Sequence, residues 1–206
     1  MKFIVAVSLA FFLFGCAGGT GTVYVAKTES ESIKSAYEDP HVQSLQQKNT
    51  DLVRDIYRRF VQSNVGIYQG GIGITTLTDQ HNEKLHYIMV NIRPSDVYFD
   101  ENTTKPEGRF SHVLMTAFPK YLKFMKSSDL DRADIEGLEF GIYWPVRDYS
   151  QCNTYGGFIE YIHIYFKKDE AQDVIDGRRD YADSLQDAEI ITSLGLQPAK
   201  SVRPVF

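Results

Sequence analysis

Two pairs of strand-like segments, each pair following a helical pattern, constrain the fold of this chain most. Residues 65–77 and 85–93 alternate apolar and polar side chains and flank a turn-prone segment. Residues 138–146 and 158–167 repeat the arrangement around a second loop. Because strands that follow each other closely usually pair antiparallel, we expect a four-stranded, largely antiparallel sheet.

Three helical patterns surround these strand pairs. Apolar side chains recur at helical spacing in residues 40–63, 110–125 and 169–194. Pro119 lies inside the second pattern, so we expect a kink near residues 115–118. The resulting order, α-β-β-α-β-β-α, predicts an α+β fold with the helices packed mainly on one face of the sheet.

The first fifteen residues have the features of a secretory signal peptide. Lys2 supplies a positive charge, and an uncharged apolar run extends from Phe3 to Phe14. A bilayer-spanning helix needs about 20 apolar residues, so this run is too short to span and instead has the length of a signal-peptide core. No other segment of the sequence approaches that length.

The tetrapeptide Leu13-Phe14-Gly15-Cys16 resembles the lipobox of bacterial lipoproteins. The resemblance covers residues 1–16 and implies that the signal peptide is removed and that Cys16 receives diacylglycerol. It also implies that the new amino terminus is acylated, with palmitate or a similar chain. Such chains hold a protein on a membrane at about 0.8 kcal/mol per buried methylene. By the same resemblance, Ala17 implies export to the outer membrane, with the domain facing the periplasm.

The remaining chain divides into three parts. Residues 16–39 begin with small, unpatterned side chains and predict a flexible tether, in which Val23–Ala26 could add a short edge strand. Residues 40–194 contain all the helical and strand patterns and predict one α+β domain. Residues 195–206 contain two prolines and no pattern, and we expect an irregular tail there.

Charge and cysteine content exclude several functional classes. Loss of Lys2 with the signal peptide leaves 21 of the 22 basic side chains against 27 acidic ones. A net negative chain is not expected to bind nucleic acid, which needs a basic face. The only cysteines are Cys16 and Cys152, which excludes a disulfide framework and a thiolate zinc cluster. We expect Cys152 to be a buried thiol, the alternative being a nucleophile activated by His163.

Other motifs for metal or nucleotide binding are weak. An acidic and histidine-rich group lies in a predicted hairpin turn, and a second acidic group lacks the order of a calcium loop. These groups are Asp79, His81, Glu83 and His86, and Asp129, Asp131, Asp134 and Glu136. The glycines of residues 70–73 lack a nucleotide-binding fingerprint and more often indicate a bulge or a close backbone approach. We therefore expect neither a metal nor a cofactor.

The best candidate site is an aromatic surface. Period-two alternation places one set of side chains opposite the most apolar faces of their strands, so these residues should share a helix-free face. This tyrosine face consists of Tyr87, Met89, Tyr143, Tyr161, His163 and Tyr165. Tyrosine is enriched at recognition surfaces, although aromatic residues also cover open sheets without binding anything. We predict that the face is substantially exposed and binds a partner.

Together these patterns predict a membrane-tethered lipoprotein of the cell envelope that acts as a non-catalytic binding or assembly module. Its expected partner is another envelope protein or an envelope polymer. The alternative is a tethered periplasmic hydrolase whose site is assembled from residues distant in sequence, and a purely structural envelope component is a third possibility. A deep pocket with converging carboxylates and histidines would favour the hydrolase, whereas a flat aromatic face would favour binding.

Overall fold

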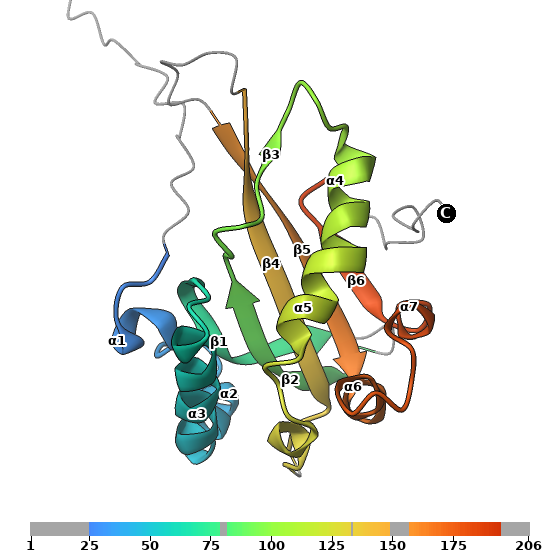
Figure 1. Ribbon diagram of the computed structural model, residues 1–206. Helices are drawn as coiled ribbons and strands as arrows, with labels where there is room; N and C mark the ends of the chain where they lie inside the picture. The colour runs from blue at the N-terminus through green and yellow to red at the C-terminus, as the bar shows by residue number, and fades with distance from the viewer. Residues whose placement is uncertain (1–24, 79–81, 133, 149–156, 195–206) are drawn as a thin grey trace, which may run out of the picture.

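The computed structural model describes residues 25–78, 82–132, 134–148 and 157–194, and Figure 1 shows its arrangement. One mixed sheet forms its centre, with the strand order β1-β2-β4-β5-β6, and β3 pairs with β4 beyond the end of β2. The strands are β1 (Ile67–Thr78), β2 (Lys84–Ile92), β3 (Phe99–Asp100), β4 (Gly137–Arg147), β5 (Gly157–Lys167) and β6 (Glu189–Thr192).

The sheet confirms the α+β class and the four long strands, but the expected strand count is wrong. Strands β3 and β6 have two and four residues, which is too short to produce a visible alternation. The segment that forms β6 was expected to continue a helix from residue 169. The pairs β1–β2, β4–β5 and β5–β6 are antiparallel, whereas β2–β4 and β3–β4 are parallel.

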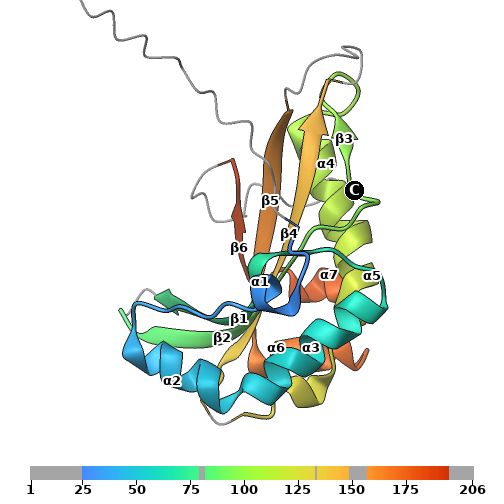
Figure 2. The ribbon, with the colours of Figure 1, turned by 90° about the vertical axis from the view of Figure 1, so that its left-hand side faces the viewer.

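Four helices, α4 to α7, lie on one side of the sheet. Figures 1 and 2 show α4 and α5 along one side of β4 and β5, with α6 and α7 on that same side. The helices are α1 (Glu29–Ser32), α2 (Pro40–Lys48), α3 (Thr50–Gln62), α4 (Pro106–His112), α5 (Phe118–Leu122), α6 (Lys168–Ile175) and α7 (Tyr181–Ser184). Within the described ranges, no helix combines the length and apolarity that a bilayer crossing requires.

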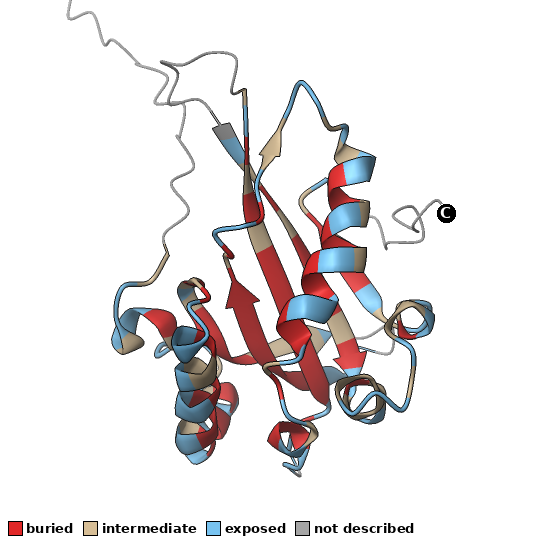
Figure 3. Cartoon of the chain, in the orientation of Figure 1, coloured by how far each residue is buried: buried red, intermediate tan, exposed pale blue. Residues whose placement is uncertain are grey.

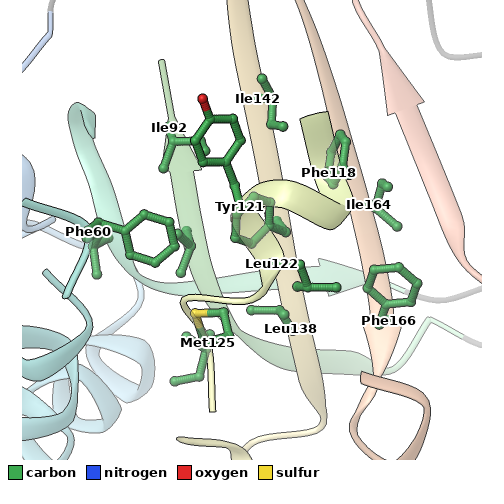
Figure 4. Packing of buried hydrophobic residues seen from close by; sticks show 14 of the residues in the cluster. Phe60, Ile92, Phe118, Tyr121, Leu122, Met125, Leu138, Ile142, Ile164 and Phe166 are labelled. Carbon is green, nitrogen blue, oxygen red and sulfur yellow. The ribbon is translucent and has the colours of Figure 1, made fainter. Parts of the chain in front are cut away.

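The hydrophobic core fills the space between these helices and the sheet. Figure 3 shows that the buried residues follow the sheet and the helix sides that contact it. Figure 4 shows side chains from α3, α5 and the strands meeting there, among them Phe60, Phe118, Leu138, Ile142 and Phe166. Ile142 and Phe166 have no exposed surface. The core therefore fixes one face of β4 and β5 under the helices and turns their alternate residues to the other side.

A π-helical turn, Val113–Ala117, lies between α4 and α5, where the kink before Pro119 was expected. Proline has no backbone N–H to donate to the carbonyl of Met115, so the regular ladder is broken there. The N–H of Phe118 instead donates to the carbonyl of Val113, five residues back. The wider turn joins the two helices, as single π-turns often do within α-helices.

The glycines of residues 70–73 form a β-bulge, which confirms their structural interpretation. Ile67 pairs with Ile92 and Ile72 pairs with Val90. Between these two pairs β1 therefore advances by five residues, whereas β2 advances by two. Gly70 has a φ of 64°, which favours glycine. At Gly71 a Cβ would lie 2.4 Å from the carbonyl oxygen of Asn91, so a side chain is excluded.

Part of the segment expected to be a tether packs against the edge of β1. Val25 and Ile33 form isolated bridges with Tyr68 and Ile72, and α1 lies between them. The hydroxyl of Tyr37 accepts a hydrogen bond from the N–H of Ile74 at 3.0 Å. Burial raises the pKa of Tyr37 to about 12. The ordered domain therefore includes residues 25–39 as well as the expected range from residue 40.

A buried ion pair joins α4 to the sheet. Arg109 on α4 donates from Nε and Nη2 to the two carboxylate oxygens of Glu160 on β5, at 2.8 and 2.5 Å. Each side chain is 3% exposed. Trp144 Nε1 on β4 donates to the same carboxylate at 2.9 Å, and Arg109 Nη1 donates to the carbonyl of Thr104. Three elements therefore meet at one carboxylate.

Candidate functional site

The tyrosine face lies on the side of β2, β4 and β5 that faces away from the core. The register places its members beside one another: Tyr143 opposes Tyr161, and on β2 Met89 pairs with Glu139 of β4, which in turn opposes Tyr165. Figure 2 shows the sheet from its edge, and among the described helices none lies against this side of β4 and β5. The structure thus brings together the residues that alternation assigned to one face.

Their exposure is lower than predicted, since none of the six residues is fully exposed. Tyr87 and Met89 are only 4% and 6% exposed, so the expectation that Tyr87 is substantially exposed is wrong. The ring of Tyr87 lies over Gly137, where a Cβ would approach its Cε1 to 2.8 Å, and it meets Tyr165 edge-on. The other four members are half-buried: Tyr143, Tyr161, His163 and Tyr165.

A hydrogen-bonded chain of side chains fixes the centre of the face. His163 Nδ1 lies 2.5 Å from Glu139 Oε1, and its Nε2 lies 2.9 Å from the hydroxyl of Tyr143. The side chain of Glu139 is 2% exposed and that of His163 14%. A buried carboxylate needs such a partner, since an unpaired charge in the interior is costly. Glu139 therefore holds His163, and His163 holds Tyr143.

Aromatic contacts extend this chain across the face. The rings of Tyr143, Tyr161 and His163 contact one another with centroid separations of 5.1 to 5.4 Å. Tyr68 on β1 stacks on Tyr143 at 4.4 Å, with the two rings 8° from parallel. Such pairs contribute about 0.5–1.5 kcal/mol in addition to the contribution of their buried area, so the half-buried rings have fixed positions.

Sequence reasoning missed Glu139 and Tyr68, for different reasons. Glu139 alternates with Leu138 and Phe140, so the same period-two argument could have placed it on the tyrosine face. Tyr68 lies before the bulge, and the extra residues of β1 reverse the face that counting from Ile72 would assign to it. Its position could be obtained only from the register.

The phenols of Tyr143 and Tyr165 remain protonated at neutral pH. Burial, and to a lesser degree the nearby carboxylate of Glu139, raise the pKa of Tyr143 well above the usual value for tyrosine. The same two causes raise the pKa of Tyr165. Both hydroxyls are therefore neutral donors and acceptors, and Tyr143 is not activated as a nucleophile.

The acidic groups noted in the sequence have structural partners. Asp129 accepts from Arg59 Nη2 at 2.7 Å, and Glu136 accepts from the N–H of His86 at 2.6 Å. The ring of His86 lies 3.2 Å from the hydroxyl of Thr76. Among the described residues, no three His, Cys, Asp or Glu side chains are grouped as metal ligands would be.

A cavity of about 580 Å³ lies between α1, α2 and α3. Uncharged polar side chains such as Gln43, Gln47 and Thr50 contribute much of its lining, and Arg54 beside it pairs with Glu29 at 3.0 Å. Among the described residues that line it there is no histidine, and Glu29 is the one carboxylate. It therefore does not have the converging acids and histidines that a hydrolase site would require.

Several residues singled out in the sequence lie outside the described ranges: Cys16, Asp79, His81 and Cys152. His163, considered as a base for Cys152, makes its described contacts with Glu139 and Tyr143. In comparisons with known proteins, no family model, no curated protein and no solved structure matches this chain.

Proposed function

We propose that this protein is a lipid-anchored component of the cell envelope and that it acts as a non-catalytic binding module. In this proposal Cys16 carries the lipid and holds the domain on the outer membrane, facing the periplasm. The half-buried part of the tyrosine face is the recognition surface, and its partner is another envelope protein or an envelope polymer. In this proposal no residue of the tyrosine face acts as a catalytic group.

One observation carries the proposal: four half-buried aromatic side chains lie together on adjacent strands, held by a buried carboxylate. Rigid tyrosines supply large contact areas and lose little conformational entropy on binding. The contacts among Tyr143, Tyr161 and His163 pre-organise this surface before a partner arrives. No described helix lies over this side of β4 and β5, which supports its assignment as a recognition surface.

One arrangement favours the alternative function, a tethered hydrolase. Glu139, His163 and Tyr143 form an acid, base and hydroxyl series from residues distant in sequence. Both ring nitrogens of His163 are already engaged within the series, and the raised pKa of Tyr143 disfavours its ionisation. A catalytic series needs an activated nucleophile, so these features support a positioning role within a binding surface.

Lipid attachment is tested by metabolic labelling with a fatty-acid probe. Wild-type protein expressed in a bacterial host should incorporate the probe, and Cys16→Ser should not, because the thiol is the attachment point. Cys152→Ser is the matched control and should label like wild type. Equal labelling of wild type and Cys16→Ser would show that the anchor does not depend on this cysteine.

Partner binding is tested by replacing two of the half-buried tyrosines. The double variant Tyr161→Ser and Tyr165→Ser should lose capture of the partner, because central aromatics can each contribute about 2 kcal/mol or more to binding. A photo-crosslinking amino acid at position 161 identifies that partner in intact cells. The same amino acid at position 98 is the control, since Tyr98 is 59% exposed but does not belong to the face.

Crosslinked species should form from position 161 and not from position 98. The proposal fails if both positions give the same species, or if the double variant captures the partner as wild type does. A thermal melt of each variant separates loss of binding from loss of folding.

A further inference from the structure

Two arginines extend the tyrosine face at the ends of β2 and β4. Asn91 lies on this face, because a Cβ on Gly141 would meet its Oδ1 at 1.9 Å, and Arg93 follows two residues later. The N–H of Arg93 donates to the carbonyl of Gly66 at 2.7 Å, which continues the β1–β2 ladder. On β4, Arg147 lies four residues beyond Tyr143 and so has the same orientation in the pleat.

Arg93 differs from every other sheltered arginine among the described residues. Arg59, Arg109 and Arg179, which are at least partly buried, pair with Asp129, Glu160 and Asp187. Arg93 is also partly buried, yet its guanidinium has no described carboxylate within ion-pair distance. Its Nε is fully buried and has no hydrogen-bond acceptor in the described structure.

A charge of the same sign, that of Arg147, acts on Arg93. Burial, and then the positive charge of Arg147, lower the pKa of Arg93. Asp100 pairs with Arg147 across the strands, but its Oδ1 accepts from the N–H of Asn102 at 2.9 Å. Bringing two guanidinium groups together with partial loss of water is unfavourable unless an anion joins them.

The residues outside the described ranges offer little to neutralise this pair. The sequence outside the described ranges contains a single acidic side chain, Asp79. That residue follows Thr78 at one end of β1, whereas Arg93 bonds to Gly66, which precedes the other end of β1. An external anionic ligand would neutralise the positive charge of Arg93 and Arg147.

We infer that Arg93 and Arg147 form a binding subsite for an oxyanion, a phosphate or carboxylate group, on the ligand that the tyrosine face takes. Guanidinium groups match both anions through paired N–H donors. Ile92 pairs with Ile142, so Arg93 follows in register beside Tyr143, on which Tyr68 stacks, and the rest of the ligand would contact these aromatic rings. The inference adds an anionic group to the ligand of the proposed function. It rests on that function only where it assigns the anion to the partner.

The subsite is tested on the full chain in a nonionic detergent, with the ¹⁵N–¹H signals of the arginine Nε groups as the readout. Sodium phosphate and sodium acetate are titrated separately at constant ionic strength. The signal that is lost in Arg93→Met should move and saturate with at least one anion, and the anion that works distinguishes a phosphoryl from a carboxylate ligand. Arg147→Ser should weaken this binding about tenfold, as expected for loss of one charged hydrogen-bond donor.

Arg58→Met is the matched control, since Arg58 is exposed on α3 and has no described ion pair, and it should bind as wild type does. Arg93→Met should fold and keep or raise the melting temperature without anion, because it removes an unpaired charge. An Arg93 signal that stays unchanged, or that drifts linearly with both anions like the exposed arginines, would overturn the inference. Saturable phosphate binding together with normal partner capture by the Tyr161 and Tyr165 double variant would refute the proposed function alone.

Discussion

Replacing Arg109 by Met should lower the free energy of unfolding by about 3–5 kcal/mol, the range found when one partner of a buried ion pair is removed. The substitution leaves the carboxylate of Glu160, 3% exposed, with the indole N–H of Trp144 as its remaining described partner. It also removes the link from α4 to β5. The hydrogen bonds that Arg109 donates to Glu160 raise the pKa of Arg109, so its charge is present throughout the accessible pH range. Urea denaturation followed by circular dichroism measures the loss.

Two further variants identify the cause of that loss. Adding Glu160→Gln to Arg109→Met removes the buried charge and keeps an oxygen acceptor for Trp144, so the double variant should be more stable than Arg109→Met. Arg178→Met removes exposed ion pairs with Asp173 and Asp176 and should cost far less, because exposed ion pairs contribute little to stability. A cost for Arg109→Met no greater than that of Arg178→Met would show that the buried pair does not hold α4.

The four long strands could be predicted because their alternation is a local property. Once one side of β4 is committed to the core by residues such as Ile142, its neighbours Gly141 and Tyr143 must lie on the other side. The common face of Tyr143, Tyr161 and Tyr165 follows from that rule alone. The short strand β6 could not be predicted, because four residues fit a helix as well as a strand.

The burial of Tyr87 could not be predicted because it depends on which strand lies beside β2. The crossover from β2 through α4 and α5 to β4 makes these two strands parallel neighbours and places Gly137 opposite Tyr87. Gly137 and Gly141, on either side of Glu139, leave the space that the Tyr87 ring and the Asn91 amide occupy. A single sequence shows these glycines but not their partners, so the depth of the face appears only with the register.

The same limit applies to the centre of the site. Both Glu139 and His163 are visible in the sequence, but their contact depends on the pairing of β4 with β5, in which Glu139 opposes Tyr165 and His163 opposes Gly141. The diagonal placement lets the imidazole reach along β4 to the carboxylate on one side and to Tyr143 on the other. Glycine at 141 removes the side chain that would stand between them.

Replacing His163 by Leu should therefore destabilise the domain strongly and disorder the tyrosine face. The carboxylate of Glu139, 2% exposed, would lose its described partner, and the hydroxyl of Tyr143 would lose the imidazole. We expect a loss of about 3–5 kcal/mol in the free energy of unfolding, as for other buried charges left unpaired. Adding Glu139→Met removes that charge beside Met89, so the double variant should recover much of the loss while Tyr143 remains without its hydrogen bond.

The matched control is His112→Leu, because His112 is exposed on α4 and contacts Phe99 only edge-on. It should change stability by about 0.5 kcal/mol or less. Partner crosslinking from position 161 should fall in His163→Leu and stay reduced in the stable double variant, since the imidazole no longer fixes Tyr143 beside Tyr161. If His163→Leu and His112→Leu have the same melting temperature, His163 does not stabilise the buried carboxylate of Glu139. If the double variant recovers stability and full crosslinking together, the chain from Glu139 to Tyr143 supports the fold and does not position the recognition surface.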